Sequence, residues 1–129
     1  MWNETKITEI KDRVYQANRR LPEEGLVKLT WGNVSEIDRN LKIIVIKPSG
    51  IPYDELKPEN MVVCDLQGET IEEPSLNPSS DLRTHLMLYQ HFKGISAVVH
   101  THSSHAVAWA QSGRVVPVYG TTSCRYFLR

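Results

Sequence analysis

The sequence is poor in cysteine, lacks a long apolar run and carries no excess of charge of either sign. Its 129 residues include two cysteines, too few for the disulfide framework of a small secreted protein. No stretch approaches the ~18 apolar residues that would suggest a membrane span. The first residues are charged throughout and do not look like a secretory signal. We therefore expect a cytoplasmic protein with reduced thiols and no membrane partner.

The balance of charge excludes a further class of partner. Lysine plus arginine total 15, as do aspartate plus glutamate, so the formal net charge is zero. Proteins that bind nucleic acid usually carry a basic surplus, so we expect no nucleic-acid partner. The 40% of apolar residues is enough for a core in a chain of single-domain length. Composition is equally compatible with an enzyme and a binding module, so the motifs must decide.

The hydrophobic pattern predicts a mixture of helices and strands in one domain, residues 1–129. Ile7, Ile10 and Val14 lie three and four residues apart, which predicts a first helix that ends within residues 21–25. Further helices are expected from about residue 81 and over 104–111, with strands at 29–33, 41–46, 61–66, 69–72, 95–99 and 115–118. Because no regular alternation of strand and helix is present, we predict α/β layers around a mainly antiparallel sheet.

The strongest local signal for chemistry is the sequence His100-Thr101-His102, which follows an apolar strand. Residues two apart on a strand point to the same face, so these imidazoles can bind one divalent metal ion. The ordinary alternative is a pair of surface histidines. His85 and His105 are also near in sequence, and a place on a helix surface is the more ordinary explanation for both.

A carboxylate, Asp81, follows Ser79 and Ser80 at a predicted helix start, where either serine could cap the helix. The ordinary explanation for Asp81 is a first-turn carboxylate that complements the helix dipole. The alternative is a role in metal binding or proton transfer. Free backbone N–H groups beside two hydroxyls would also suit a phosphate group.

Two other loops of small residues have a similar character. Gly32 and Asn33 fall in a strand-like segment, where glycine suggests close approach by a ligand or by another backbone. Lys47, Ser49 and Gly50 follow a buried strand and offer a cation, a hydroxyl and a flexible backbone. Each loop alone is explained as a turn. Together with the histidine pair, the loops predict a metal site for an anionic ligand.

Four motifs, in this order, resemble the class II aldolase/adducin family: LTWGNVS (29–35), IKPSG (46–50), PSSD (78–81) and VHTHSSHA (99–106). The likeness extends from about residue 5 to residue 122 and is strongest to the sugar-phosphate epimerase branch. It implies a three-layer α/β/α sandwich with a mainly antiparallel central sheet, incomplete at the C-terminus. It also implies a homo-oligomer, a tetramer in the family.

The resemblance also implies roles for individual residues. One Zn²⁺ per subunit would be bound by His100 and His102, with Asp81 beside it or bound to it as a catalytic group. The residues implied to contact a phosphorylated pentulose substrate are Gly32, Asn33, Lys47, Ser49, Gly50, Ser79 and Ser80.

The activity implied is the zinc-dependent epimerisation of L-ribulose 5-phosphate to D-xylulose 5-phosphate. The C3–C4 bond would be cleaved in a retro-aldol step, and the aldehyde would add back from its other face. Two alternatives are a class II sugar-phosphate aldolase, which would release the aldehyde, and a non-catalytic remnant of the family.

The sequence departs from the family pattern near its C-terminus. The family's third zinc histidine has no counterpart in these 129 residues. Arg125 stands where the family has an acid/base aspartate, and Tyr126 is not a match to its late acid/base tyrosine. The resemblance therefore predicts a chain that is truncated relative to the family domain.

Overall fold

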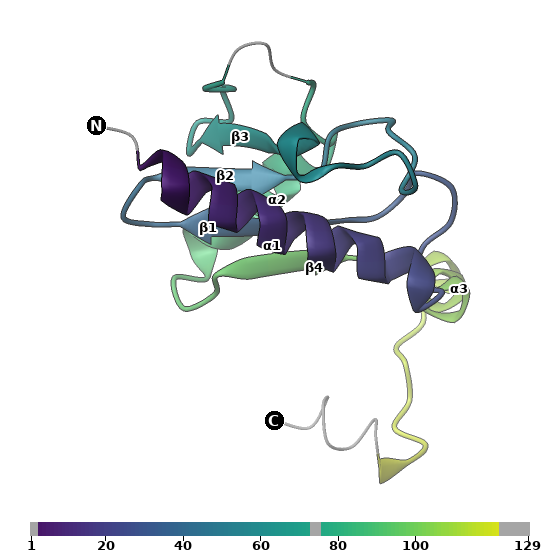
Figure 1. The fold of residues 1–129 in the computed structure, drawn as a ribbon. Helices are drawn as coiled ribbons and strands as arrows, with labels where there is room; N and C mark the ends of the chain where they lie inside the picture. The colour runs from purple at the N-terminus through teal and green to yellow at the C-terminus, as the bar shows by residue number, and fades with distance from the viewer. Residues whose placement is uncertain (1–2, 73–75, 122–129) are drawn as a thin grey trace.

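The computed structural model describes residues 3–72 and 76–121. Its four strands form one antiparallel sheet in the order β3-β2-β1-β4. In Figure 1, α1 crosses one face of this sheet and α2 lies on the opposite face. The predicted three-layer α/β/α architecture is thus confirmed. In chain order the elements are α1 (Glu4–Glu23), β1 (Asn33–Asp38), β2 (Ile43–Ile46), the 3-10 helix η1 (Pro58–Asn60), β3 (Val62–Asp65), α2 (Leu82–His91), β4 (Ala97–His100) and α3 (Ser104–Ser112).

Strand β2 lies inside the sheet, and both of its faces are covered. Successive strand residues point to opposite faces. Ile43 and Val45 accordingly belong to the apolar layer beneath α1, and Ile44 and Ile46 to the layer beneath α2. All four are at most 1% exposed. Burial on both faces explains why this strand is a continuous β-branched run rather than an alternating one.

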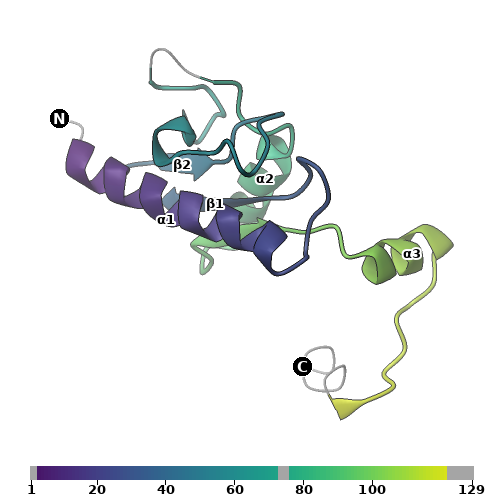
Figure 2. The same ribbon diagram turned by 45° about the vertical axis from the view of Figure 1, so that its right-hand side comes forward.

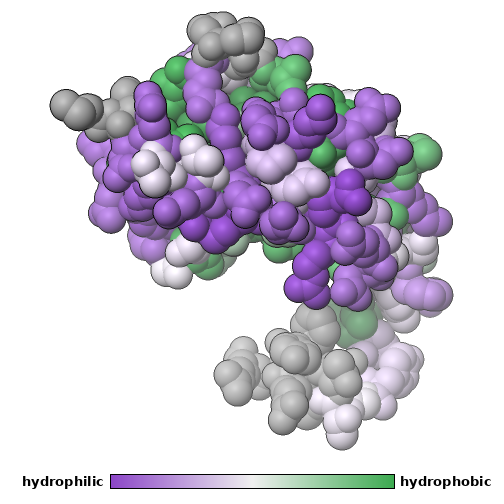
Figure 3. Space-filling view, viewed as in Figure 1, coloured by the Kyte–Doolittle hydropathy of each residue, from purple (hydrophilic) through white to green (hydrophobic). Residues whose placement is uncertain are grey.

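The first helix forms as its apolar spacing predicts. Asn3 accepts a hydrogen bond from the backbone of Lys6 at 3.1 Å and caps the helix. Residues Ile7, Ile10 and Val14 are buried against the sheet. The exposed side of α1 is charged, so this face of the molecule is mostly hydrophilic (Figure 3).

Three predicted strands are wrong. Residues 69–72 contain only an isolated bridge, between Thr70 and Cys64. Residues 29 and 30 form a turn, and β1 begins only at Asn33. Leu29 and Gly32 have φ values of +53° and +81°, which no β-strand residue adopts. Residues 115–118 form no strand either, and Val115 is 89% exposed.

The last described segment extends away from the sheet. Figure 2 shows α3 beyond the end of the sheet, and none of its residues is buried. Within residues 3–72 and 76–121, no helix has the length and apolar character needed to cross a membrane.

Candidate metal and sugar-phosphate site

One pocket of about 470 Å³ lies where β1 begins and β4 ends. The antiparallel register pairs Asn33 with His100, which places the start of one motif against the end of another. The structure brings all ten residues predicted for the site into the wall of this pocket. They are Gly32, Asn33, Lys47, Ser49, Gly50, Ser79, Ser80, Asp81, His100 and His102.

The carboxylate of Asp81 joins the separate motifs. Its Oδ2 accepts hydrogen bonds from Asn33 Nδ2 at 2.7 Å and from His100 Nδ1 at 2.8 Å. Burial opposes the charged form, but the hydrogen bonds from Asn33 and His100 outweigh it and lower the pKa of Asp81. Asp81 is therefore a carboxylate at neutral pH.

The position of Asp81 on α2 differs from the predicted one. Asp81, and not a serine, is the N-cap residue, and its side chain makes no capping bond. The carboxylate instead faces the pocket residues Asn33 and His100. The ordinary explanation, a first-turn carboxylate serving only the helix, therefore does not describe this side chain.

The two histidines of the motif lie close together. Their ring centroids are 4.7 Å apart, and the ring of Trp31 lies 5.5 Å from that of His102. The backbone N–H of His102 donates to Leu26 at 3.0 Å, which fixes the chain just after β4. Because Asp81 occupies Nδ1 of His100, the other ring nitrogen, Nε2, is available to a metal ion.

The histidine pair fits as two ligands of a metal ion but does not complete a site. A catalytic zinc ion usually has three protein ligands. Among the described residues, no group of three histidine, cysteine or acidic side chains is arranged to hold a metal ion. His85 is buried against Ser35 and His105 is exposed on α3, and neither lines the pocket. Arg125 and Tyr126 lie outside the described residues.

The two loops predicted to bind phosphate are bonded to each other. Pro48 and Pro78 form an isolated antiparallel bridge. On either side of it, Ser49 N–H donates to Asn77 at 2.9 Å and Ser79 N–H donates to Lys47 at 3.0 Å. These backbone donors are therefore already used. Of the residues predicted to bind phosphate in these two loops, Ser49, Gly50 and Ser80 are exposed.

Lys47 lines the pocket with its ammonium group turned to backbone oxygen atoms. Nζ donates to Ile51 at 2.9 Å and to Pro48 at 3.3 Å, and lies 4.8 Å from the ring centroid of Tyr53. Burial lowers the pKa of Lys47. In this arrangement the ammonium group stabilises the loop of residues 47–51, and direct contact with substrate stays a prediction.

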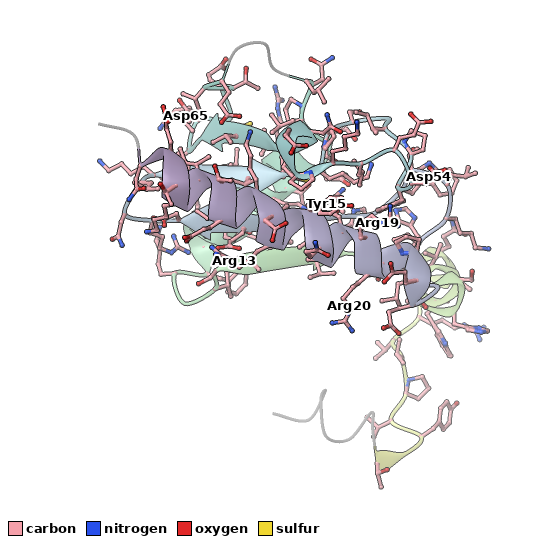
Figure 4. All side chains as sticks on the ribbon, viewed as in Figure 1. Arg13, Tyr15, Arg19, Arg20, Asp54 and Asp65 are labelled. Atoms are coloured by element: carbon pink, nitrogen blue, oxygen red, sulfur yellow. The ribbon has the colours of Figure 1, made fainter. Side chains whose placement is uncertain are left out.

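Gly32 is required by the approach of another backbone. A Cβ here would lie 2.9 Å from the carbonyl oxygen of His100 and would also collide with Val27. The hydroxyl of Tyr53, a residue that the sequence did not indicate, shares its one proton between the carbonyls of Trp31 and Gly32, at 2.9 and 2.8 Å. It supports the pocket through backbone carbonyls, and no sequence pattern indicates such a contact. Figure 4 draws the described side chains as sticks on the ribbon, with Arg13, Tyr15, Arg19 and Arg20 labelled along α1.

The architecture and the pocket agree with comparisons to known proteins. The family described as Class II Aldolase and Adducin N-terminal domain matches residues 12–129. The L-ribulose-5-phosphate 4-epimerase UlaF of Salmonella paratyphi C (strain RKS4594) is 51% identical over 119 residues, which cover 92% of this chain and 52% of that protein. The chain thus spans about half the length of the curated relatives it matches.

Solved structures agree with this result. An L-fuculose 1-phosphate aldolase is 35% identical with a TM-score of 0.74, over 79% of this chain and 48% of the aldolase. The L-fuculose-1-phosphate aldolase of Thermus thermophilus is 25% identical with a TM-score of 0.72, over 92% and 59% of the two chains. The chain therefore belongs to the class II aldolase and adducin family.

Proposed function

We propose that this chain provides the metal- and phosphate-binding part of an L-ribulose-5-phosphate 4-epimerase, an isomerase of carbohydrate metabolism. The observation that carries the proposal is the convergence of the histidine pair, Asp81 and the two serine loops on one pocket. The relative named L-ribulose-5-phosphate 4-epimerase, at 51% identity, supports L-ribulose 5-phosphate as the substrate. We infer a cytoplasmic homo-oligomer, a tetramer by resemblance to the family.

In this function the phosphate of the sugar is bound by the exposed residues Ser49, Gly50 and Ser80. The bonded loops hold these residues side by side before substrate arrives, so little ordering is needed on binding. Asn33 and Asp81 lie between the phosphate loops and the histidine pair, where they orient the reacting end of the sugar.

The reacting end of the substrate lies toward His100 and His102. A Zn²⁺ ion held by His100 and His102 would supply a Lewis acid for the substrate carbonyl. Asp81 accepts the Nδ1 proton of His100, which orients the ring and leaves Nε2 as the nitrogen that can bind a metal ion. The described residues thus bind and orient the substrate, and no described residue is assigned as the acid/base pair of turnover.

The test uses the full chain, Zn²⁺ and L-ribulose 5-phosphate. We expect calorimetry to show binding of Zn²⁺ near one per chain and then of the sugar phosphate, and NMR to follow any formation of D-xylulose 5-phosphate. Joint replacement of His100 and His102 by alanine is expected to abolish Zn²⁺ binding, whereas replacement of the exposed His91 is not. Unchanged Zn²⁺ binding in the double variant would refute the metal site, and failure to bind the sugar phosphate would refute the function.

An aldolase is the second candidate, because a solved L-fuculose 1-phosphate aldolase is 35% identical with a TM-score of 0.74. Trapping of aldehyde separates the two activities. Release of free aldehyde at the rate of substrate loss would favour the aldolase, and retention of the aldehyde until it adds back favours the epimerase. A folded oligomer that binds neither Zn²⁺ nor sugar phosphate would instead be a non-catalytic family member.

A further inference from the structure

Between β1 and α2, two hydrogen-bonded side-chain pairs lie next to each other. Asn33 and Ser35 are two residues apart on β1 and share the face turned to α2. Asp81 and His85 are four residues apart, one helical turn. Asn33 Nδ2 contacts Asp81 at 2.7 Å, and Ser35 Oγ contacts His85 Nδ1 at 2.7 Å. The first pair belongs to the pocket, and the second is buried behind it.

The proton on the ring of His85 can be assigned by counting donors. We assign the single hydroxyl proton of Tyr89 to the carbonyl of Ser35, 3.0 Å away, because a carbonyl oxygen can only accept. The 2.7 Å contact of this hydroxyl with Ser35 Oγ then requires Ser35 to be the donor. The remaining contact of Ser35 Oγ must accept a proton from His85 Nδ1. This assignment places the proton of His85 on Nδ1 and makes its Nε2 an acceptor.

Two acceptors are left in this buried layer. His85 Nε2 and Asn33 Oδ1 are buried and make no hydrogen bond to the described residues. The amide of Asn33 is not reversed, because its Nδ2 must donate to the Asp81 carboxylate. Burial lowers the pKa of His85 to about 4, with Asp81 opposing and His100 adding to the shift, so Nε2 remains an acceptor at neutral pH. Two acceptors cannot bond to each other, and buried polar atoms are rarely left unpaired.

We propose that one buried water molecule donates its two hydrogens to His85 Nε2 and Asn33 Oδ1, which makes His85 a positioning residue for the pocket. The water fixes the far side of the Asn33 amide. That amide, from its other end, holds Asp81, and Asp81 in turn holds the ring of His100. The effect of this series of hydrogen bonds on metal binding rests on the proposed function. The tautomer of His85 and the buried water do not depend on that function.

The first test reads the tautomer of His85 in the unaltered chain without metal. In nitrogen-15-labelled protein, long-range hydrogen–nitrogen correlation distinguishes the protonated from the bare ring nitrogen. We expect His85 to carry its proton on Nδ1. A proton on Nε2 would overturn the proposal, because that nitrogen would then donate and could accept nothing from the water. No variant is needed, so folding of a variant cannot obscure this result.

The second test compares His85→Asn with His85→Gln. An asparagine amide reaches the place of Nδ1 and keeps the contact with Ser35, and a glutamine amide reaches the place of Nε2 and keeps an acceptor for the water. We expect hydrogen exchange of the Asn33 side-chain amide to be about tenfold faster in His85→Asn, the effect of losing one buried hydrogen bond. In His85→Gln the exchange rate should be nearly unchanged. His91→Asn, on the exposed side of the same helix, is the matched control.

Zn²⁺ titration of the same variants links the water to the pocket. We expect the affinity for Zn²⁺ to fall about tenfold in His85→Asn and to equal that of the unaltered chain in His85→Gln. A tenfold loss is typical when a residue that orients a metal ligand is replaced. Equal exchange and equal Zn²⁺ affinity in all three variants would overturn the positioning role. If the unaltered chain binds no Zn²⁺, the proposed function fails, while the tautomer and the amide exchange still decide on the water.

Discussion

At the scale of single residues, Gly32 lies where the loop before β1 passes under the end of β4. Its φ of +81° is strained for any other residue, and an added Cβ would lie 2.9 Å from the carbonyl oxygen of His100. We expect Gly32→Ala to lower the free energy of unfolding by about 2–4 kcal/mol, from backbone strain together with overpacking. Urea unfolding followed by circular dichroism measures this loss.

Gly25 provides the control for this substitution. It has a similar φ of +67°, but a Cβ there would meet nothing within 4 Å. Gly25→Ala should therefore show only the cost of backbone strain, about 1 kcal/mol. Equal losses in the two variants would mean that the approach of β4 does not constrain position 32.

His85 makes stability depend on pH in a defined direction. Burial lowers its pKa to about 4, below the ~6.5 of an unfolded histidine, so protonation favours the unfolded state. The stability that neutral His85 contributes is fully present above about pH 6.5 and is lost as the pH falls toward 4. The loss is about 3 kcal/mol, because each pKa unit corresponds to about 1.4 kcal/mol.

Unfolding measured at several pH values tests this expectation. Between pH 6.5 and 4, His85→Gln should lose less stability than the unaltered chain, whereas His91→Gln should follow the unaltered chain. Parallel curves for all three proteins would show that His85 is not the group responsible.

At the scale of elements, one buried asparagine joins α1 to β1. Asn18 is fully buried, donates to the carbonyl of Val34 at 3.1 Å and accepts from the N–H of Val34 at 2.9 Å. Val34 lies between Asn33 and Ser35, whose side chains face the opposite layer. Asn18 therefore fixes, from the α1 side, the strand that carries Asn33 into the pocket.

Replacement of Asn18 by leucine would leave both polar backbone groups of Val34 buried without their partner. We expect a loss of about 2–4 kcal/mol in the free energy of unfolding, since each unpaired buried group costs about 1–3 kcal/mol. Thermal and urea unfolding measure it. Gln16→Leu, at an exposed position of the same helix, should change stability by no more than about 0.5 kcal/mol. A small effect at both positions would contradict this role of Asn18.

The elements also show what could be predicted from the sequence. The apolar period of α1 and the β-branched run of β2 predict both elements because burial on the sheet selects those residues directly. The alternation of apolar and small residues at 29–33 wrongly predicted a strand. The positive φ values of Leu29 and Gly32 exclude a strand there, and a side-chain pattern does not reveal them. The motifs predicted the residues that meet in the pocket, whereas Tyr53 acts on backbone carbonyls and leaves no pattern.

At the scale of the whole molecule, the segment after β4 carries apolar side chains that the described structure leaves exposed. Val115 and Tyr119 are 89% and 85% exposed, and Val99 on β4 is 59% exposed. Exposed apolar surface of this kind favours association between chains. We therefore expect self-association that depends on this segment, measurable by size-exclusion chromatography with light scattering.

Joint replacement of Val115 and Val116 by lysine should shift the chain toward smaller species without changing its melting temperature. Ile71→Lys, at a partly exposed position elsewhere in the chain, is the control and should leave association unchanged. If the double variant associates as strongly as the unaltered chain, another surface is responsible.

In the proposed function, the bridge between Pro48 and Pro78 bears on how fast a sugar phosphate can bind. Proline has no N–H to donate, and here the hydrogen bonds fall on the flanking residues, so the bridge loses nothing by containing two prolines. Both rings also remove backbone rotation from the loops that carry the exposed serines. Because the loops are already bonded to each other, we expect encounter with the sugar phosphate to limit the rate of association. Solvent viscosity should then slow association in direct proportion, as it does for collision between rigid bodies.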